Sequence, residues 1–383
     1  MKKALATILA LVMALSVTTM AWADDVAKID GTGYATLQEA VNAANAANNG
    51  QTIVLQSDVV LTASLNVAVN KTVTLDLNSY KITADMNGPH MICNAGNLTI
   101  TDSSANKTGE IAKIGAETNF GYVIENHGTM TLDRCKISST SVKSSAIENG
   151  WYTARANTAG TSCTMTIQNT EVVSVNADGG LYTVKNDDYG VMVINGGVFT
   201  NSVAGAGAVL NWNDLTINGG TFTGASAVRT LKSGSSDFET GKSQIKNGTF
   251  NGGIDTLDAY KTGITIAVTG GTFSTDVTEY LAEGKILQKN GDTYTAVTNS
   301  GITSGTYTAK PTVPDGYKVV ENTDGTFTVE KVGGYYYYQP TTDTKADDTK
   351  GSPKTFDAGI ALYVGMALTS AAGVAFVGKK RED

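Results

Sequence analysis

The segment Ile194–Phe199 reads Ile-Asn-Gly-Gly-Val-Phe, and nearly the same six residues return three times later in the chain. The later copies are Ile217–Phe222, Ile245–Phe250 and Val268–Phe273, with starts 23, 28 and 23 residues apart. Degenerate copies come earlier, at Leu77–Ile82, Leu132–Ile137 and Ile167–Val172. A period of roughly 20 to 50 residues is the sign of a solenoid or an array, because each unit stacks on its neighbours.

Each copy is introduced by a short strand pattern, in which two apolar residues stand two apart around Thr or Val. The examples are Leu98–Ile100, Met130–Leu132, Met165–Ile167, Met192–Ile194 and Leu215–Ile217. A period of two places the apolar pair on one face of a strand. The Asn-Gly-Gly step that follows has the backbone freedom for a sharp bend. We expect the Phe or Ile beyond the bend to return to the core.

A third strand precedes each pair and carries an Ile-x-Asn or Val-x-Asn step. Successive coils of a solenoid bring equivalent residues to within about 4.8 Å of each other. The repeated amides are then able to hydrogen-bond along the stack, as in other amide ladders. The predicted ladder consists of Asn94, Asn126, Asn149, Asn186 and Asn211.

Composition narrows the choice of partners. The chain holds 42 glycines, only 17% charged residues and a formal charge of −8, which suits a turn-rich β protein. Only Arg134, Arg155 and Arg229 precede the C-terminal tail. We therefore expect no basic cluster, and no nucleic-acid or anionic-lipid partner. The three cysteines do not form a disulfide framework, and we expect them to be small apolar core or coil residues.

Both ends of a β solenoid need caps, because a bare strand edge invites pairing with other chains. Thr36–Glu39 has the spacing of a capping box and opens an apolar stripe, which predicts a helix over the first coil. Asp276–Leu281 repeats that pattern at the far end. A hairpin is predicted at Asn290-Gly291, and a second one around Asp324-Gly325 predicts a small β module.

The first residues have the layout of a secretory signal peptide. Lys2 and Lys3 precede the apolar run 4–17, and Ala21 and Ala23 form an Ala-x-Ala site. We expect cleavage after Ala23, since the apolar run is short for a membrane span.

The last residues also have the layout of a targeting signal. The run 358–378 has no charge and is followed by Lys379-Lys380-Arg381, which predicts a transmembrane helix with a cytoplasmic basic tail. Upstream stand Ser352, Pro353, Lys354 and Thr355, followed by Phe356. This layout resembles the sorting signal of sortase substrates, Leu-Pro-x-Thr-Gly, which implies sortase and peptidoglycan as partners and Thr355 as the residue joined to the wall. Ser352 replaces Leu and Phe356 replaces Gly, so simple membrane anchoring stays open as the alternative.

Together these features predict an all-β chain with five parts. They are a signal peptide at 1–23, a parallel β-helix with a cap helix at 24–297, a small β-hairpin module at 298–332, a spacer with the sorting motif at 333–355, and a transmembrane helix with its tail at 356–383. From Asp30 to Val297 the repeats resemble the right-handed, pectate-lyase-like β-helix superfamily. Their Gly-Gly-Thr-Phe and Ile-x-Asn steps are similar to those of surface proteins from gut-dwelling Gram-positive bacteria. Such a likeness implies the fold and does not transfer an activity.

Few residues are candidates for catalysis or metal binding. Polygalacturonases of that superfamily carry a Gly-His-Gly step, and His127 is the nearest match here. Glu125 and Glu148 occupy the same position of neighbouring coils, about 5 Å apart, a separation that suits a retaining glycosidase. The alternative is a surface charge stack relieved by Lys185. A calcium site at Asp178, Asp187 and Asp188 is a weak possibility, and the only two histidines, His90 and His127, do not make a His-rich metal site, so we expect no metal and no cofactor.

The sequence therefore favours a non-catalytic surface protein, an adhesin or displayed structural module that binds a glycan or a host surface protein. Trp151, Tyr152 and Trp212 are the contact candidates, because Trp and Tyr are favoured at binding surfaces. Packing of these rings on the rod is the alternative. A carbohydrate-active enzyme and a passive spacer in a surface layer remain as rival functions.

Overall fold

The structure is a computed structural model that describes residues 25–115, 119–140, 143–151, 161–175, 182–233 and 239–333. The chain divides into two units, Met1–Val332 and Gly333–Asp383, and the description concerns the first. Ala21 and Ala23, Tyr152, Asp178, the motif Ser352–Thr355 and the expected C-terminal span lie outside the described residues. Within the described residues, no helix is long and apolar enough to cross a membrane.

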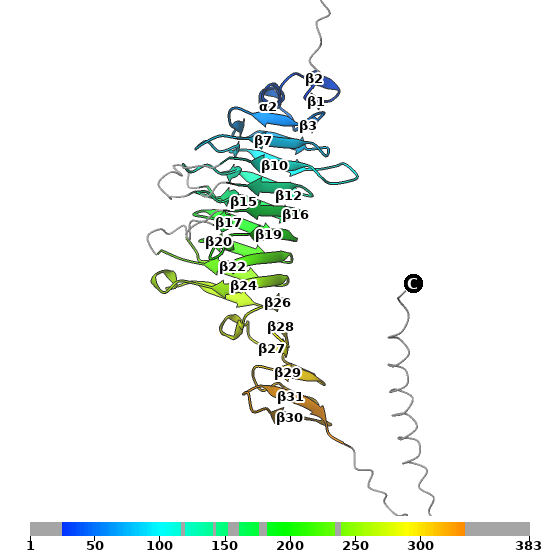
Figure 1. Cartoon of the computed structure of the whole chain (residues 1–383), viewed down its shortest axis with the longest axis vertical. Helices are drawn as coiled ribbons and strands as arrows, with labels where there is room; N and C mark the ends of the chain where they lie inside the picture. Colours follow the sequence, from blue (N-terminus) through cyan, green and yellow to red (C-terminus); the bar gives the residue numbers. More distant parts are fainter. Residues whose placement is uncertain are drawn as a thin grey trace, which may run out of the picture. The chain divides into compact units, whose positions relative to one another are not determined.

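The chain winds in coils of short strands that stack along one axis (Figure 1). One sheet runs in the order β2-β1-β3-β6-β9-β12-β15-β18-β21-β23-β25, and from β3 onward all neighbours are parallel. Its strands are β1 Ala27–Ile29, β2 Thr32–Tyr34, β3 Gln51–Leu55, β6 Thr72–Asp76, β9 Asn97–Thr101, β12 Thr129–Asp133, β15 Cys163–Gln168, β18 Gly190–Ile194, β21 Asp214–Ile217, β23 Lys242–Ile245 and β25 Thr265–Val268.

The second sheet contains two parallel columns, which merge where β22 and β24 run through both. The column after the bend holds β4 Val59–Leu61, β7 Lys81–Ala84, β10 Glu110–Lys113, β13 Lys136–Ser139, β16 Thr170–Ser174, β19 Gly197–Asn201, β22 Thr221–Thr230, β24 Thr249–Asp255 and β26 Thr272–Phe273. The column of Ile-x-Asn steps holds β5 Leu65–Val67, β8 Ile92–Asn94, β11 Ile124–Asn126, β14 Ile147–Asn149, β17 Tyr182–Asn186 and β20 Gly207–Asn211. In most coils one strand of the first sheet is followed by two strands of the second, and the long parallel stacks are consistent with the β-helix solenoid predicted from the repeats.

The bend of the repeat is built on glycine. Gly197 has a φ of +129°, and a Cβ there would lie 2.2 Å from the carbonyl oxygen of Thr170 in the coil beside it. Only glycine tolerates both this backbone conformation and this close approach. Phe199, two residues later, is fully buried, as expected from the repeat.

A column of phenylalanines fills one end of the core. Phe199, Phe222, Phe250 and Phe273 stack with ring centroids 4.9, 5.0 and 4.9 Å apart, which is close to the spacing of the strands that carry them. Aliphatic residues from all three columns of strands complete the same apolar core.

The first coil is capped by helix α2, Leu37–Ala46. The Thr36 hydroxyl accepts from the Glu39 amide at 3.2 Å, and the Glu39 carboxylate accepts from the Thr36 amide at 3.1 Å, so the predicted capping box is confirmed. The helix buries Leu37, Ala40, Val41 and Ala44 against the first strands.

The far end is closed by strands rather than by a helix. The expected helix at Asp276–Leu281 is only a 3₁₀ turn, η3 Thr278–Tyr280; a similar turn, η2, spans Asp258–Tyr260. The hairpin β27 Lys285–Asn290 and β28 Thr293–Thr298 follows, and β28 pairs antiparallel with β26. An antiparallel partner satisfies the open edge of the last coil, so a longer helix is not needed there.

A small module follows the hairpin, with β29 Gly305–Tyr307, β30 Tyr317–Glu321 and β31 Phe327–Lys331. Its own apolar cluster contains Ile286, Tyr307 and Val329. The neighbouring Leu287 belongs to the main core. Strand β27 therefore joins the two cores.

Candidate functional site

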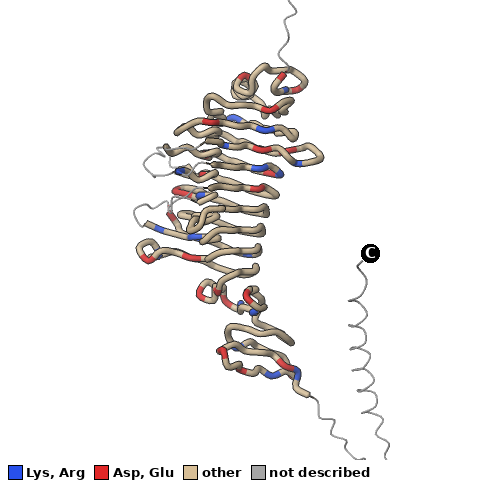
Figure 2. The backbone as a smooth tube through the Cα atoms, in the orientation of Figure 1, with Lys and Arg blue, Asp and Glu red and all other residues tan. Residues whose placement is uncertain are grey.

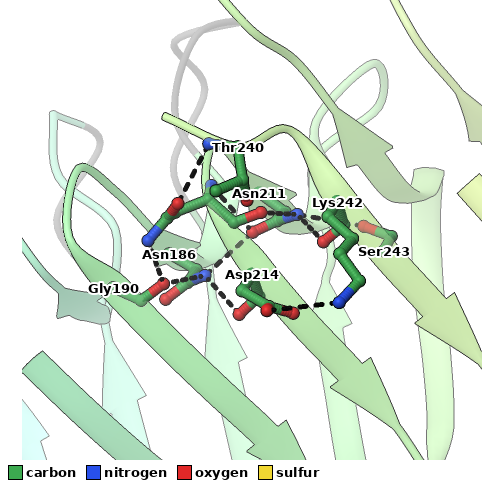
Figure 3. Close-up of polar contacts among 8 residues, drawn as sticks. Asn186, Gly190, Asn211, Asp214, Thr240, Lys242 and Ser243 are labelled. Carbon is green, nitrogen blue, oxygen red and sulfur yellow. Dashed lines mark hydrogen bonds and ion pairs between the residues drawn. The ribbon is translucent and has the colours of Figure 1, made fainter. Parts of the chain in front are cut away.

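The Asn ladder runs through the column of Ile-x-Asn strands, and each amide nitrogen donates to the amide oxygen of the next coil. The four links measure 2.7 to 2.8 Å and join Asn94, Asn126, Asn149, Asn186 and Asn211 in that order. Figure 3 shows the last part, where Asn211 also donates to the hydroxyl of Ser243 and the carbonyl of Lys242. These bonds fix the register of the coils and thereby align the neighbouring side chains.

The residue before each ladder asparagine points outward, and the register stacks these residues into a second file. Glu125 pairs with Cys93 on one side and with Glu148 on the other, and Lys185 follows Glu148. The file continues through Leu210, Arg229 and Asp255. The register places Glu125 and Glu148 on adjacent strands, as the sequence predicts.

Two histidines flank the carboxylate of Glu125. His90 Nε2 lies 3.5 Å and His127 Nε2 3.7 Å from the same oxygen, Oε1. The amide of Tyr122 donates to His90 Nδ1 at 3.0 Å, so the neutral His90 ring carries its proton on Nε2, facing Glu125. His127 stacks face to face on Trp151, with 3.6 Å between ring centroids.

The surroundings favour the uncharged forms of these groups. Burial lowers the pKa of His127 to about 4, with a further contribution from His90. Burial, together with Lys113, lowers the pKa of His90, and burial raises the pKa of Glu125. Burial also raises the pKa of Cys93 to about 12, with Glu125 adding to the shift, so Cys93 is a thiol and a poor nucleophile at neutral pH.

Glu148 lies deeper than its neighbour. Its side chain is 2% exposed against 20% for Glu125, and it contacts Lys185, whose side chain is 7% exposed. Lys185 in turn forms an ion pair with Asp187. Lys185 lies beside Glu148, as the charge-stack alternative expects, but this part of the stack is not at the surface, because both charges are buried.

The aromatic contact candidates are separated along the solenoid. Trp151 stacks on His127, which flanks Glu125, whereas Trp212 packs with Tyr182, Leu210 and Leu231. Trp212 follows β20, three strands from β11, which corresponds to about 14 Å. For Trp212 the structure therefore supports packing on the rod.

The described ranges also contain potential metal ligands and thiols. No group of three His, Cys, Asp or Glu side chains there is arranged to hold a metal ion. The three cysteines are free; Cys135 and Cys163 are buried, and Cys93 is half-buried on the outward file.

Cationic side chains gather in a place the sequence did not indicate. A groove of about 620 Å³ is lined by Lys81, Lys107, Arg134 and Lys136, together with Glu110 and Glu171. Along neighbouring strands Lys81, Glu110, Lys136 and Glu171 alternate in register, with ion pairs of 3.0, 3.6 and 3.7 Å. Figure 2 shows basic and acidic positions intermixed along these coils. Lys81, Lys136 and Arg134 form ion pairs with Glu110, Glu171 and Asp133, so the groove carries charges of both signs.

His90 and Tyr122 were not predicted as site residues. Each stands two residues before the Ile of its Ile-x-Asn step, and the rings stack with centroids 5.0 Å apart. That shared offset is the signal from which they were predictable. A comparison of the chain with protein-family models, curated proteins and solved structures gives no match, so the site must be interpreted from its geometry.

The low pKa of His127 gives a prediction about stability. The unfolded chain takes up this proton near the ordinary value of 6.5 and the folded chain only near 4, so stability falls as the pH drops from about 6.5 towards 4. After allowance for solvent screening, we expect His127→Gln to reduce the loss between about pH 7.5 and about pH 5 by roughly 1 kcal/mol. Guanidinium denaturation of both proteins at the two pH values measures this difference. Equal losses in the variant and the parent would show that His127 titrates normally.

Proposed function

We propose that the protein is exported, held at the extracellular face of the cell by its C-terminal segment, and displays the solenoid as a non-catalytic, glycan-binding surface. The signal-peptide layout, the uncharged run 358–378 and the basic tail support export and anchoring. The finer fold that we propose is the right-handed, pectate-lyase-like β-helix, because parallel strands joined by crossovers almost always wind right-handed.

One observation carries the binding proposal: the partly exposed carboxylate of Glu125 lies between two imidazoles, one of which is stacked on the indole of Trp151. Sugar hydroxyls need such acceptors and donors. The side chains of His90, Glu125 and His127 are 29, 20 and 22% exposed, so a ligand on the surface has access to all three. Aromatic rings at such sites supply large contact areas at a small cost in conformational entropy.

Burial of Glu148 favours binding over glycoside hydrolysis. A retaining glycosidase needs two carboxyl groups about 5 Å apart that both reach the same sugar. Glu125 is partly exposed and therefore accessible to a sugar. Glu148 is buried and lies close to Lys185, so it does not reach the same sugar. Carbohydrate-active chemistry stays as the second candidate, because the raised pKa of Glu125 beside two histidines is typical of a general acid.

The test is a binding assay of the purified secreted part against mucin glycans, plant polysaccharides and host matrix proteins. We expect binding to at least one glycan class, and a loss of about tenfold in Glu125→Gln, because the amide replaces an acceptor oxygen and leaves a sugar hydroxyl without its partner, at a cost of about 1–3 kcal/mol. Glu330→Gln is the matched control, since Glu330 forms an exposed ion pair with Lys318 in the small module.

Other outcomes decide between the rivals. Release of reducing or unsaturated ends from a polysaccharide, abolished in Glu125→Gln, would establish the enzyme. If the protein neither binds a glycan nor releases sugar ends in any of the assays, the passive spacer is the function that remains. Mass spectrometry of cell-wall digests tests the anchoring step: a mature chain ending at Thr355 supports wall attachment by sortase, and an intact C-terminus supports the membrane anchor.

A further inference from the structure

A cluster of three charged groups, the buried trio, lies next to the surface site along the stack of coils and consists of Lys185, Asp187 and Glu148. Lys185 forms an ion pair with Oδ2 of Asp187, and its Nζ lies 3.9 Å from Oε1 of Glu148. The three side chains are 7, 6 and 2% exposed. Two carboxyl groups therefore face one ammonium group in a site that water hardly reaches.

Such a cluster is costly as a set of ions. Each buried ion loses its hydration, and the attraction within a pair often fails to repay that loss. A neutral amide in the place of the Lys185–Asp187 pair has nearly the same shape and carries no charge. Groups held in contact also react with very high effective concentrations, so the loss of water from the pair is favoured here far more than in solution.

We propose that Lys185 and Asp187 condense to an intramolecular amide, with Glu148 as the group that moves the proton. The Nζ of Lys185 attacks Cγ of Asp187, the C–N bond forms, and the bond from Cγ to Oδ2 breaks. The ammonium and the carboxylate together lose one water molecule, whose oxygen is Oδ2, and no electrons are exchanged with any other group. Glu148 takes one proton from the ammonium before the attack and a second from the nitrogen after it has added to Cγ, and it delivers both to Oδ2, which leaves as water.

The neighbourhood supports each part of this step. Burial raises the pKa of Glu148 to about 8, so near neutral pH both its acid and its base forms are accessible. The backbone amide of Asp188 donates to Oδ1 of Asp187 at 3.1 Å, which is where negative charge develops when the nitrogen adds to Cγ. Oδ1 then becomes the amide oxygen.

Two other cations of the solenoid, Lys113 and Arg229, are also buried or half-buried, but each lacks one of the groups that amide formation needs. Lys113 is 1% exposed, but its Nζ donates to the carbonyl oxygens of Pro89 and Gly121 at 2.6 and 2.9 Å. Backbone carbonyls do not condense with an amine. Arg229 pairs with Asp255 through two hydrogen bonds, but a guanidinium is too weakly nucleophilic to form the amide.

Tryptic digestion of the denatured full-length protein tests the amide. Trypsin does not cleave after an acylated lysine, so we expect no cleavage at Lys185 and a peptide spanning 156–229 that is lighter than its sequence by one water. Cleavage at Lys185 with full peptide masses would overturn the proposal. An internal succinimide at Asp187 also loses one water but leaves Lys185 open to trypsin, and that result would equally contradict it.

Variants assign the role of Glu148. In Glu148→Gln we expect cleavage at Lys185 and the full mass, with a circular dichroism spectrum like that of the parent. Glu125→Gln is the control, because Glu125 is the equivalent residue one coil away, and it should keep the amide. If Glu148→Gln also retains the amide, the assignment of the proton carrier to Glu148 is wrong. Since neither readout depends on a glycan, failure here leaves the binding proposal standing, and the reverse also holds.

Discussion

Replacing Asn126 by alanine is expected to lower the free energy of unfolding by about 3–5 kcal/mol, since each buried polar group left without a partner costs about 1–3 kcal/mol. The Asn126 amide donates to Asn149, Thr164 and Gly128 and accepts from Asn94 and Gly128. The side chain is fully buried, so water cannot replace these bonds. Guanidinium denaturation of the secreted part, followed by circular dichroism, measures the loss.

The control for this variant is Asn251→Ala, which removes a single exposed hydrogen bond to Thr223. We expect a change below about 0.5 kcal/mol there, as for most surface substitutions. If both variants lose a similar amount of unfolding free energy, the ladder does not stabilise the fold more than a single surface hydrogen bond does.

Replacing Phe222 by alanine is expected to cost about 3–5 kcal/mol for a different reason, which is the cavity it leaves. The ring is fully buried and is stacked between Phe199 and Phe250, at 4.9 and 5.0 Å. Coils on both sides therefore lose a packing surface. Thermal unfolding of the variant and its parent gives the measurement.

Two further substitutions bracket that result. Phe222→Leu keeps an apolar side chain of intermediate size, so it should cost clearly less than the alanine variant. Phe120 is 60% exposed, and Phe120→Ala should leave stability almost unchanged. A neutral Phe222→Ala would contradict the observed stacking of the core.

The coil architecture was predictable because stacking turns equal offsets in the sequence into direct neighbours in space. The Ile-x-Asn steps give the ladder, and the Gly-Gly-Thr-Phe steps give the bend and the buried phenylalanines. The capping box at Thr36 was readable because all of its bonds are local. The short 3₁₀ turn η3 at Thr278 was not predictable from local sequence, because strand β28, from further along the chain, pairs with the edge of the last coil.

The site was only half predictable. Register alone places Glu125 beside Glu148, but it says nothing of which outward residue is covered. Burial of Glu148 and Lys185 does not follow from the repeat, because the segments between the strands differ in length and sequence from coil to coil. The two histidines meet at Glu125 from separate coils, and the four cations of the groove are likewise brought together only by the stacking of coils.

The most direct test of the account is a crystal structure of the secreted part, inspected at the five ladder asparagines. We expect the ladder to lie on successive coils, with amide nitrogen and oxygen 2.7 to 2.8 Å apart at every step from Asn94 through Asn126, Asn149 and Asn186 to Asn211. Asparagine side chains that point in different directions, or that lie several strands apart, would contradict the stacked coils and with them the surface site and the buried trio.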